Sequence, residues 1–281
     1  MLNVTFELKS AGYCIASKSH ALRGVPKKTI KFYATYALIS HPRHGHILFD
    51  TGYTTRFYQY TRSFPFSIYA KATRVYVKEK NHAVAQIQSL GIAPEEIRYI
   101  IVSHFHADHI GGLRDFPNAK FICSEEAYAD IKGKRGFSAL KRGFIPELMP
   151  ESFEQRTQMI NIQKSNNEDP HLGKMYDLFD DGSILLYQIE GHAKGQMGAL
   201  LNTEGHDTLL IADAAWLKEN YTQMHLPSPI VRLFFDSWAN FKTSLKNVHD
   251  FHKAHPDTLI IPCHCEATYR EVSKDLTNEN G

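Results

Sequence analysis

The densest chemistry in this sequence lies in the run 103–113, which contains three histidines and one aspartate. The run directly follows the apolar stretch 97–102, whose β-branched and aromatic residues are typical of a buried strand. The C-terminal ends of such strands are where open α/β folds place their ligands. Imidazole nitrogen combined with carboxylate oxygen suits zinc, and iron, cobalt and manganese are also compatible. The candidate metal ligands in the run are His104, His106, Asp108 and His109.

Three further apolar stretches are each followed closely by another possible ligand. A single histidine after a strand is most simply a core residue with a satisfied hydrogen bond. Four strands that all end in this way predict instead one site to which each strand contributes. The stretches and the ligands that follow them are 183–189 with His192, 208–212 with Asp213, and 258–263 with His264.

On these motifs the sequence resembles the metallo-β-lactamase superfamily, in which His-x-His-x-Asp-His is followed by a later histidine, an aspartate and a last histidine. The resemblance implies an α/β protein with a four-layer αβ/βα sandwich and a site for two divalent metal ions, with zinc the leading candidate. Asp50, after an early strand, would orient a ligand histidine without binding metal itself. By this resemblance the first metal takes His104, His106 and His192, the second takes Asp108, His109 and His264, and Asp213 bridges them.

Within the superfamily, the motifs favour one branch. The bridging Asp213 separates the sequence from true β-lactamases, which usually have a cysteine there, and His106 separates it from the flavodiiron branch, which has a glutamate. The order of motifs is most similar to the N-acyl-homoserine lactonases, the quorum-quenching enzymes, and to related lactone and ester hydrolases. The resemblance therefore implies hydrolysis of a lactone or carboxylic ester by a metal-bridging hydroxide, with Asp108 as the proton shuttle.

One departure from the lactonase pattern lies three residues after the bridging aspartate. Lactonases often have a tyrosine there that contacts the substrate carbonyl, whereas this sequence has Trp216. An indole N–H donates a hydrogen bond but does not deliver a proton at neutral pH. We therefore expect Trp216 to line the substrate site, with the nearby Tyr221 as a possible source of the missing phenol.

Two alternatives use the same fold for different chemistry. A glyoxalase II-like thioester hydrolase has the same ligand set but adds a C-terminal helical region, for which little sequence remains after His264. A persulfide dioxygenase-like enzyme holds a single iron, whereas the ligands for two metals are all present here. The sequence therefore favours a lactone or ester hydrolase over both alternatives.

Composition limits the partners of the protein. The formal net charge is +2 over 281 residues, which gives no electrostatic case for binding nucleic acid. Residues 1–8 alternate like a strand and do not resemble an export signal, and no stretch reaches the length that spans a bilayer. We predict a cytoplasmic enzyme that acts on a small acyl compound and has no nucleic-acid or membrane partner.

The length of the chain suits a single hydrolase domain, 1–281, with two inserted segments. Segment 53–77 is rich in aromatic residues and is expected over the site entrance or in the subunit contact of a homodimer. Segment 132–169 mixes basic and apolar residues without strong periodicity, as lids and binding loops do. The expected strands are 4–9, 32–39, 46–50, 97–102, 120–122, 176–180, 184–189, 198–203, 208–212 and 258–263, with helices near 81–90, 124–131 and 237–253.

Two other groups of potential ligands are interpreted as structural. Cys263 and Cys265 flank His264, and if the strand continues through them they point away from the metals. The run 41–46 contains three histidines, but its proline and glycine are typical of a hairpin turn, where we expect solvated side chains.

Overall fold

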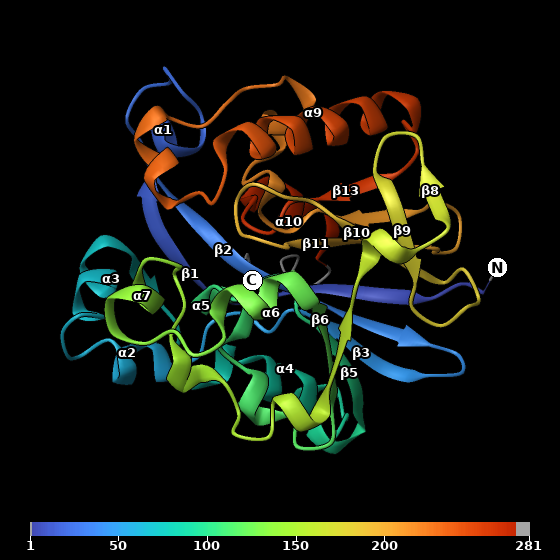
Figure 1. The fold of residues 1–281 in the computed structure, drawn as a ribbon, viewed down its shortest axis with the longest axis horizontal. Helices are drawn as coiled ribbons and strands as arrows, with labels where there is room; N and C mark the ends of the chain where they lie inside the picture. The colour runs from blue at the N-terminus through green and yellow to red at the C-terminus, as the bar shows by residue number, and fades with distance from the viewer. Residues whose placement is uncertain (1, 274–281) are drawn as a thin grey trace, which may run out of the picture.

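Two β-sheets that pack face to face form the centre of this computed structural model, which describes residues 2–273 (Figure 1). The strands of the first sheet are β1 (Thr5–Ser17), β2 (Thr29–His41), β3 (Gly45–Phe49), β4 (Arg74–Tyr76), β5 (Ile97–Ile101), β6 (Lys120–Ser124) and β7 (Thr157–Ile160). Those of the second are β8 (Asn167–Asp169), β9 (Gly173–Asp177), β10 (Ile184–Gln188), β11 (Met197–Leu201), β12 (Thr208–Leu210) and β13 (Leu259–Ile261). Their orders are β4-β1-β2-β3-β5-β6-β7 and β13-β12-β11-β10-β9-β8.

Both sheets mix parallel and antiparallel pairs. In the first sheet β3, β5, β6 and β7 run parallel to one another, and in the second β12 and β13 are parallel. The remaining named pairs are antiparallel. Parallel neighbours end at the same edge of a sheet, so residues that follow β3 and β5, or β12 and β13, are brought close together.

The helices complete the sandwich. Three helices that cover the sheets are α4 (Ala83–Ser89), α6 (Glu125–Ile131) and α9 (Trp238–Ala254). The other α-helices are α1 (Lys18–Ala21), α2 (Arg56–Tyr60), α3 (Ser67–Ala72), α5 (Ala107–Ile110), α7 (Gly136–Leu140), α8 (Lys218–Thr222) and α10 (Glu266–Val272). Figure 1 shows α9 along the second sheet and α4 on the opposite side of the molecule, against the first.

Alternation of side chains along the strands explains these layers. In β5, Ile100 packs in the apolar cluster that contains α4, whereas Ile101 packs in the cluster between the two sheets. In β12, Leu209 packs in the cluster that contains α9, whereas Leu210 faces the first sheet. Each sheet therefore buries both faces, one against helices and one against the other sheet. The predicted four-layer sandwich is confirmed.

The structure places parts of the two expected insertions differently from the sequence analysis. In 53–77, Tyr53 and Phe57 are buried in the core, and β4 pairs with β1. In 132–169, β7 pairs with β6 and extends the first sheet. The two segments meet at the surface through the exposed rings of Phe64 and Phe137, whose centroids are 5.1 Å apart.

The hairpin turn 41–46 is more ordered than expected. His41 is buried, its Nδ1 accepts hydrogen bonds from the N–H groups of Arg43 and His44, and its Nε2 lies 3.0 Å from the Ser183 hydroxyl. Burial lowers the pKa of His41, although Asp181 opposes this. The expectation of solvated histidines is therefore wrong for His41, because the turn packs against the loop between β9 and β10.

In residues 2–273, no helix has the length and apolar character needed to cross a membrane.

Candidate metal centre

The histidine-rich run forms a tight loop after β5 and then the short helix α5, which contains Asp108 and His109. His104 is fully buried, and α5 begins directly after His106. Gly111 brings the end of the loop against the segment after β3, because a Cβ there would lie 2.5 Å from the carbonyl oxygen of Gly52. This close approach places the loop beside Asp50, at the shared edge of β3 and β5.

The other three predicted ligands come from the second sheet. His192 follows β10, Asp213 lies in the short 3-10 turn Ala212–Ala214 after β12, and His264 follows β13. All three side chains are at least nine-tenths buried. The structure brings the seven predicted ligands together where the two sheets meet.

The first group of ligand atoms comes from His104, His106, His192 and Asp213, and these atoms all lie within 4.8 Å of one another. His192 Nε2 is 3.0 Å from Asp213 Oδ2 and 3.0 Å from His106 Nδ1. His104 Nε2 is buried and has no hydrogen-bond partner among the described residues. Three imidazole nitrogens and one carboxylate oxygen thus converge, which is a donor set suited to a tetrahedral metal ion.

The second group is arranged around the same Asp213. His109 Nε2 lies 3.3 Å from Asp213 Oδ1, and His264 Nε2 lies 3.3 Å from Asp213 Oδ2. Asp108 Oδ2 is slightly farther away, at 3.8 Å from His109 Nε2 and 3.6 Å from His264 Nε2. Asp213 therefore stands between two groups of histidines, as the sequence predicted for a bridging ligand.

Hydrogen bonds at the far side of two rings indicate which nitrogen faces the centre with a lone pair. His264 Nδ1 lies 2.7 Å from the Tyr33 carbonyl oxygen, and His109 Nδ1 lies 2.7 Å from Asp50 Oδ2. Both partners only accept, so both Nδ1 atoms must donate. Nε2 of each ring therefore faces a carboxylate of the cluster, and a metal ion between them would take the place of a proton on that nitrogen. The donor set therefore fits metal ions.

The electrostatics of the cluster favour the same interpretation. Burial and neighbouring imidazoles hold the pKa of His104 and of His106 well below the ordinary value, so both rings are in the neutral form that binds metals. Burial would raise the pKa of Asp213, but the histidines around it, His264 first, hold it well below its ordinary value. Burial lowers the pKa of His109 and of His264, but Asp50 and Asp213, respectively, outweigh it and raise both pKa values, so a metal ion bound here would displace protons from these two rings.

Asp50 contacts His109, a member of the second group, on the side of its ring that faces away from the cluster. Its carboxylate accepts hydrogen bonds from the Ser103 N–H at 2.8 Å, from the Ser103 hydroxyl at 2.7 Å and from His109 Nδ1. Asp50 has a φ of 60°, a conformation in which aspartate is tolerated better than most residues. This geometry orients His109, which is the role expected for Asp50 from the sequence.

The structure separates the two expected substrate-binding residues. Trp216 lies at the metal cluster, where its Nε1–H donates to Asp213 Oδ2 at 3.1 Å and its ring lies against Phe235. Tyr221 is buried in the apolar cluster beneath α9, and its hydroxyl points to the Ile260 carbonyl oxygen at 3.5 Å. Burial raises the pKa of Tyr221 to about 12. The structure therefore does not bring the Tyr221 phenol to this cluster.

Cys263 lies in the cluster, contrary to the sequence interpretation. Its thiol donates to Asp213 Oδ1 at 2.6 Å. Strand β13 ends at Ile261 and the chain then turns, so the alternation from which we expected Cys263 to point away does not reach it. Cys265 does pack in an apolar cluster, as expected.

Comparisons with known proteins agree with the fold. The sequence model of the metallo-beta-lactamase superfamily matches residues 31–248. The N-acyl homoserine lactonase AttM of Azorhizobium caulinodans is 28% identical over 199 residues, which cover 68% of each protein. The N-acyl homoserine lactonase of Bacillus cereus is 24% identical over 212 residues, which cover 75% of this chain and 76% of that protein.

Solved structures share the whole architecture. An N-acyl homoserine lactone hydrolase with N-hexanoyl-L-homoserine bound at its catalytic metal centre has a TM-score of 0.72, at 18% identity and with 96% of both chains covered. The dizinc quorum-quenching lactonase AidC has a TM-score of 0.64, at 16% identity, with 95% of this chain and 89% of that chain covered. Since the family match spans most of the sequence, including Asp50 and the metal loop, the chain belongs to the metallo-beta-lactamase superfamily.

Proposed function

We propose that the protein is a two-metal hydrolase of lactones or carboxylic esters. In this proposal His104, His106 and His192 hold the first metal, Asp108, His109 and His264 hold the second, and Asp213 bridges them. The observation that carries the proposal is the position of Asp213, whose two oxygens lie 3.0–3.3 Å from Nε2 atoms of three histidines of both groups. Zinc is the metal that we expect, because nitrogen ligands predominate.

When bound, two such metal ions lower the pKa of a water molecule and polarise a substrate carbonyl. The residues of the chain supply the rest of the mechanism. Asp213 and Asp50 are almost fully enclosed, whereas the side chain of Asp108 is 12% exposed. Asp108 is therefore the carboxylate that can exchange protons with solvent, and we assign to it the delivery of a proton to the departing alkoxide oxygen.

The surroundings of the cluster support a small acyl substrate with an apolar tail. Trp216 and Phe235 lie against each other, and both rings also lie against His192. The sequence relatives are N-acyl homoserine lactonases, which supports an acyl-homoserine lactone as one candidate. A cytoplasmic location, a homodimer and the cap role of segments 53–77 and 132–169 remain predictions.

The test of this function measures both the metal content of the purified chain and its substrate preference. The purified chain is expected to bind two zinc ions, and lactones or esters are expected to have the highest kcat/KM in a panel with phosphodiesters and glutathione thioesters. A single tightly bound iron would favour a persulfide dioxygenase-like enzyme instead. If thioesters or phosphodiesters react about 100-fold faster than every lactone and ester, a transition-state preference of about 2.7 kcal/mol, the substrate assignment is wrong.

Variants of Trp216 test the substrate side of the site. Trp216→Ala is expected to act mainly by raising KM, because it removes a ring that lies beside His192 and Phe235. Trp216→Tyr is expected to keep or improve lactone turnover, because it restores the phenol that lactonases often have at this position, a group that can both donate and accept a hydrogen bond. Trp216→Phe is the matched control, since it keeps an aromatic ring without a donor. Equal kcat values for the Tyr and Phe variants on a lactone would contradict a role for the donor.

A further inference from the structure

Of the four cysteines, Cys263 alone lies outside the four apolar clusters of the core. Cys123 and Cys265 are members of such clusters, and Cys14 packs against two of them. The Cys263 sulfur instead contacts a carboxylate, Asp213 Oδ1, at 2.6 Å. Packing of an apolar side chain does not explain this position.

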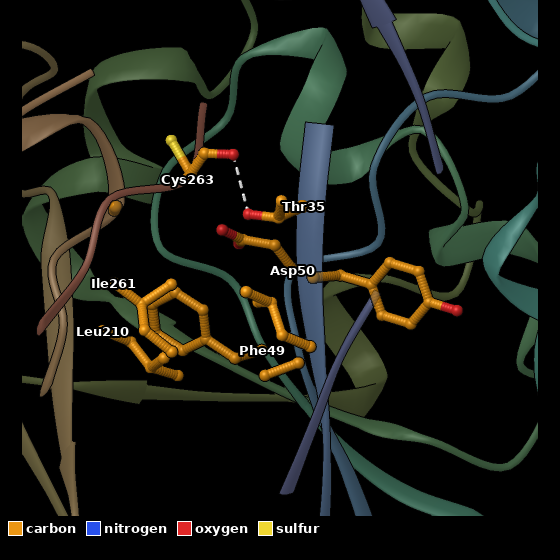
Figure 2. Close-up of a pocket in the computed structure, with 10 residues that line it drawn as sticks. Thr35, Phe49, Asp50, Leu210, Ile261 and Cys263 are labelled. Carbon is orange, nitrogen blue, oxygen red and sulfur yellow. Dashed lines mark hydrogen bonds between the residues drawn. The ribbon is translucent and has the colours of Figure 1, made fainter. Parts of the chain in front are cut away.

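The backbone of Cys263 is fixed from both sheets. Its carbonyl oxygen accepts hydrogen bonds from the Thr35 hydroxyl at 2.7 Å and from the Thr35 N–H at 3.3 Å, and its own N–H donates to the Ala212 carbonyl at 3.5 Å. Figure 2 shows the carbonyl turned towards Thr35 and the sulfur turned to the other side. Cys263 also lines a cavity of about 20 Å³ between the sheets, together with the apolar side chains of Leu210 and Ile261. The thiol is thus held towards the cluster.

A second observation points to a ligand at the same place. His109 is 1% exposed, and its Nε2 has no hydrogen-bond partner among the described residues. That nitrogen lies 3.3 Å from Asp213 Oδ1, the oxygen that the Cys263 thiol contacts. The ligand atoms of His109, Asp213, Cys263 and His264 all lie within 4.8 Å of one another, whereas Asp108 is not part of this compact group.

We propose that Cys263 is a ligand of the second metal, together with His109, His264 and Asp213. The inference rests on the proposed metal site and adds a sulfur donor that the superfamily motif does not contain at this position. On binding, the sulfur–metal bond replaces the S–H bond, and the thiol proton passes to solvent. Because thiolates select soft or borderline ions, the second site would prefer zinc to manganese. In this arrangement Cys263 takes the place of Asp108 as a ligand of the second metal, and Asp108, at the edge of the group, keeps the proton transfer that we assign to it.

Zinc-edge X-ray absorption on the wild-type chain, loaded with two zinc ions, tests this without any substitution. We expect a sulfur neighbour at about 2.3 Å, beside nitrogen and oxygen neighbours at about 2.0–2.2 Å. Only one of the two zinc ions would bind the sulfur, and the spectrum averages over both ions. The amplitude of the sulfur shell should therefore correspond to about half a sulfur atom per zinc. A spectrum with two bound zinc ions and no sulfur would overturn the inference and leave the proposed hydrolase intact. A chain that binds no metal would overturn both.

Cobalt substitution in variants identifies the cysteine. The wild-type chain and the control Cys265→Ala should both show a near-ultraviolet sulfur-to-cobalt band, because Cys265 packs in an apolar cluster. Cys263→Ala should lose the band and should bind the second metal at least about 10-fold more weakly. Residues that only hydrogen-bond to metal ligands contribute about 10–100-fold to metal affinity, so a direct ligand should contribute at least the lower value. Persistence of the band in Cys263→Ala would overturn the assignment. If Cys263→Ala does not fold, Cys263→Ser serves in its place, because serine nearly preserves the volume of the side chain and has no sulfur to give the band.

Discussion

Asp213→Asn is expected to reduce hydrolytic activity by more than about 100-fold while leaving the fold intact. The change preserves the volume of the side chain but removes the negative charge that faces His109, His192 and His264. Outer partners of metal ligands are worth about 10–100-fold, and a shared ligand should exceed that range. Steady-state kinetics, metal analysis and circular dichroism on the same preparation measure the three effects.

Asp50→Asn provides the graded comparison. Asp50 contacts the side of His109 that faces away from the cluster, so we expect a loss of about 10–100-fold in activity or metal affinity. Full turnover by Asp213→Asn with unchanged metal content would refute the bridging assignment. A larger effect of Asp50→Asn than of Asp213→Asn would also contradict it.

Gly191→Ala is expected to cost about 3 kcal/mol or more in the free energy of unfolding. Gly191 has a φ of 115°, which alone costs a residue with a side chain about 1–3 kcal/mol. An added Cβ would also lie 2.0 Å from the backbone nitrogen of Phe241, in α9. Because backbone cannot yield as a flexible side chain does, α9 must move away from the loop that carries His192. We expect lower activity together with lower stability in denaturant unfolding.

Gly205→Ala is the matched control. Gly205 also has a positive φ, 85°, but among residues 2–273, its two chain neighbours aside, no heavy atom lies within 4 Å of a Cβ built there. Its cost should therefore be limited to the left-handed conformation, about 1–2 kcal/mol, with no effect on activity. Equal losses of stability in the two variants would show that contact with α9 does not matter.

The seven predicted ligands could be read from the sequence because each one follows an apolar strand. The end of a buried strand fixes where the short turn after it lies, as for Asp213 after β12 and His264 after β13, but not the direction of each side chain in that turn. The same logic failed for Cys263, since β13 stops at Ile261 and the turn that follows has no alternation. It also failed for Tyr221, where closeness in sequence to Trp216 did not mean closeness in space.

The strands that the sequence analysis did not predict, and the burial of His41, depend on contacts between segments that are distant in the sequence. Strands β4, β7 and β8 have only three or four residues each, and β4 and β7 lie at sheet edges beside strands distant in sequence. Such short stretches have no periodicity that distinguishes them from loops. His41 was expected in solvent because its turn is visible in the sequence, whereas the loop of Ser183 that covers it is not.

The proposed ligands come from both sheets. His104, His106, Asp108 and His109 follow β5 of the first, and His192, Asp213 and His264 follow strands of the second. Neither sheet alone provides either complete donor set, so the metals can be loaded only late in folding, after the two halves of the chain have docked. A metal present at 100 times its dissociation constant would then contribute about 2.7 kcal/mol per site to that docking. Scarcity of metal would thus lower the abundance of the enzyme as well as its turnover.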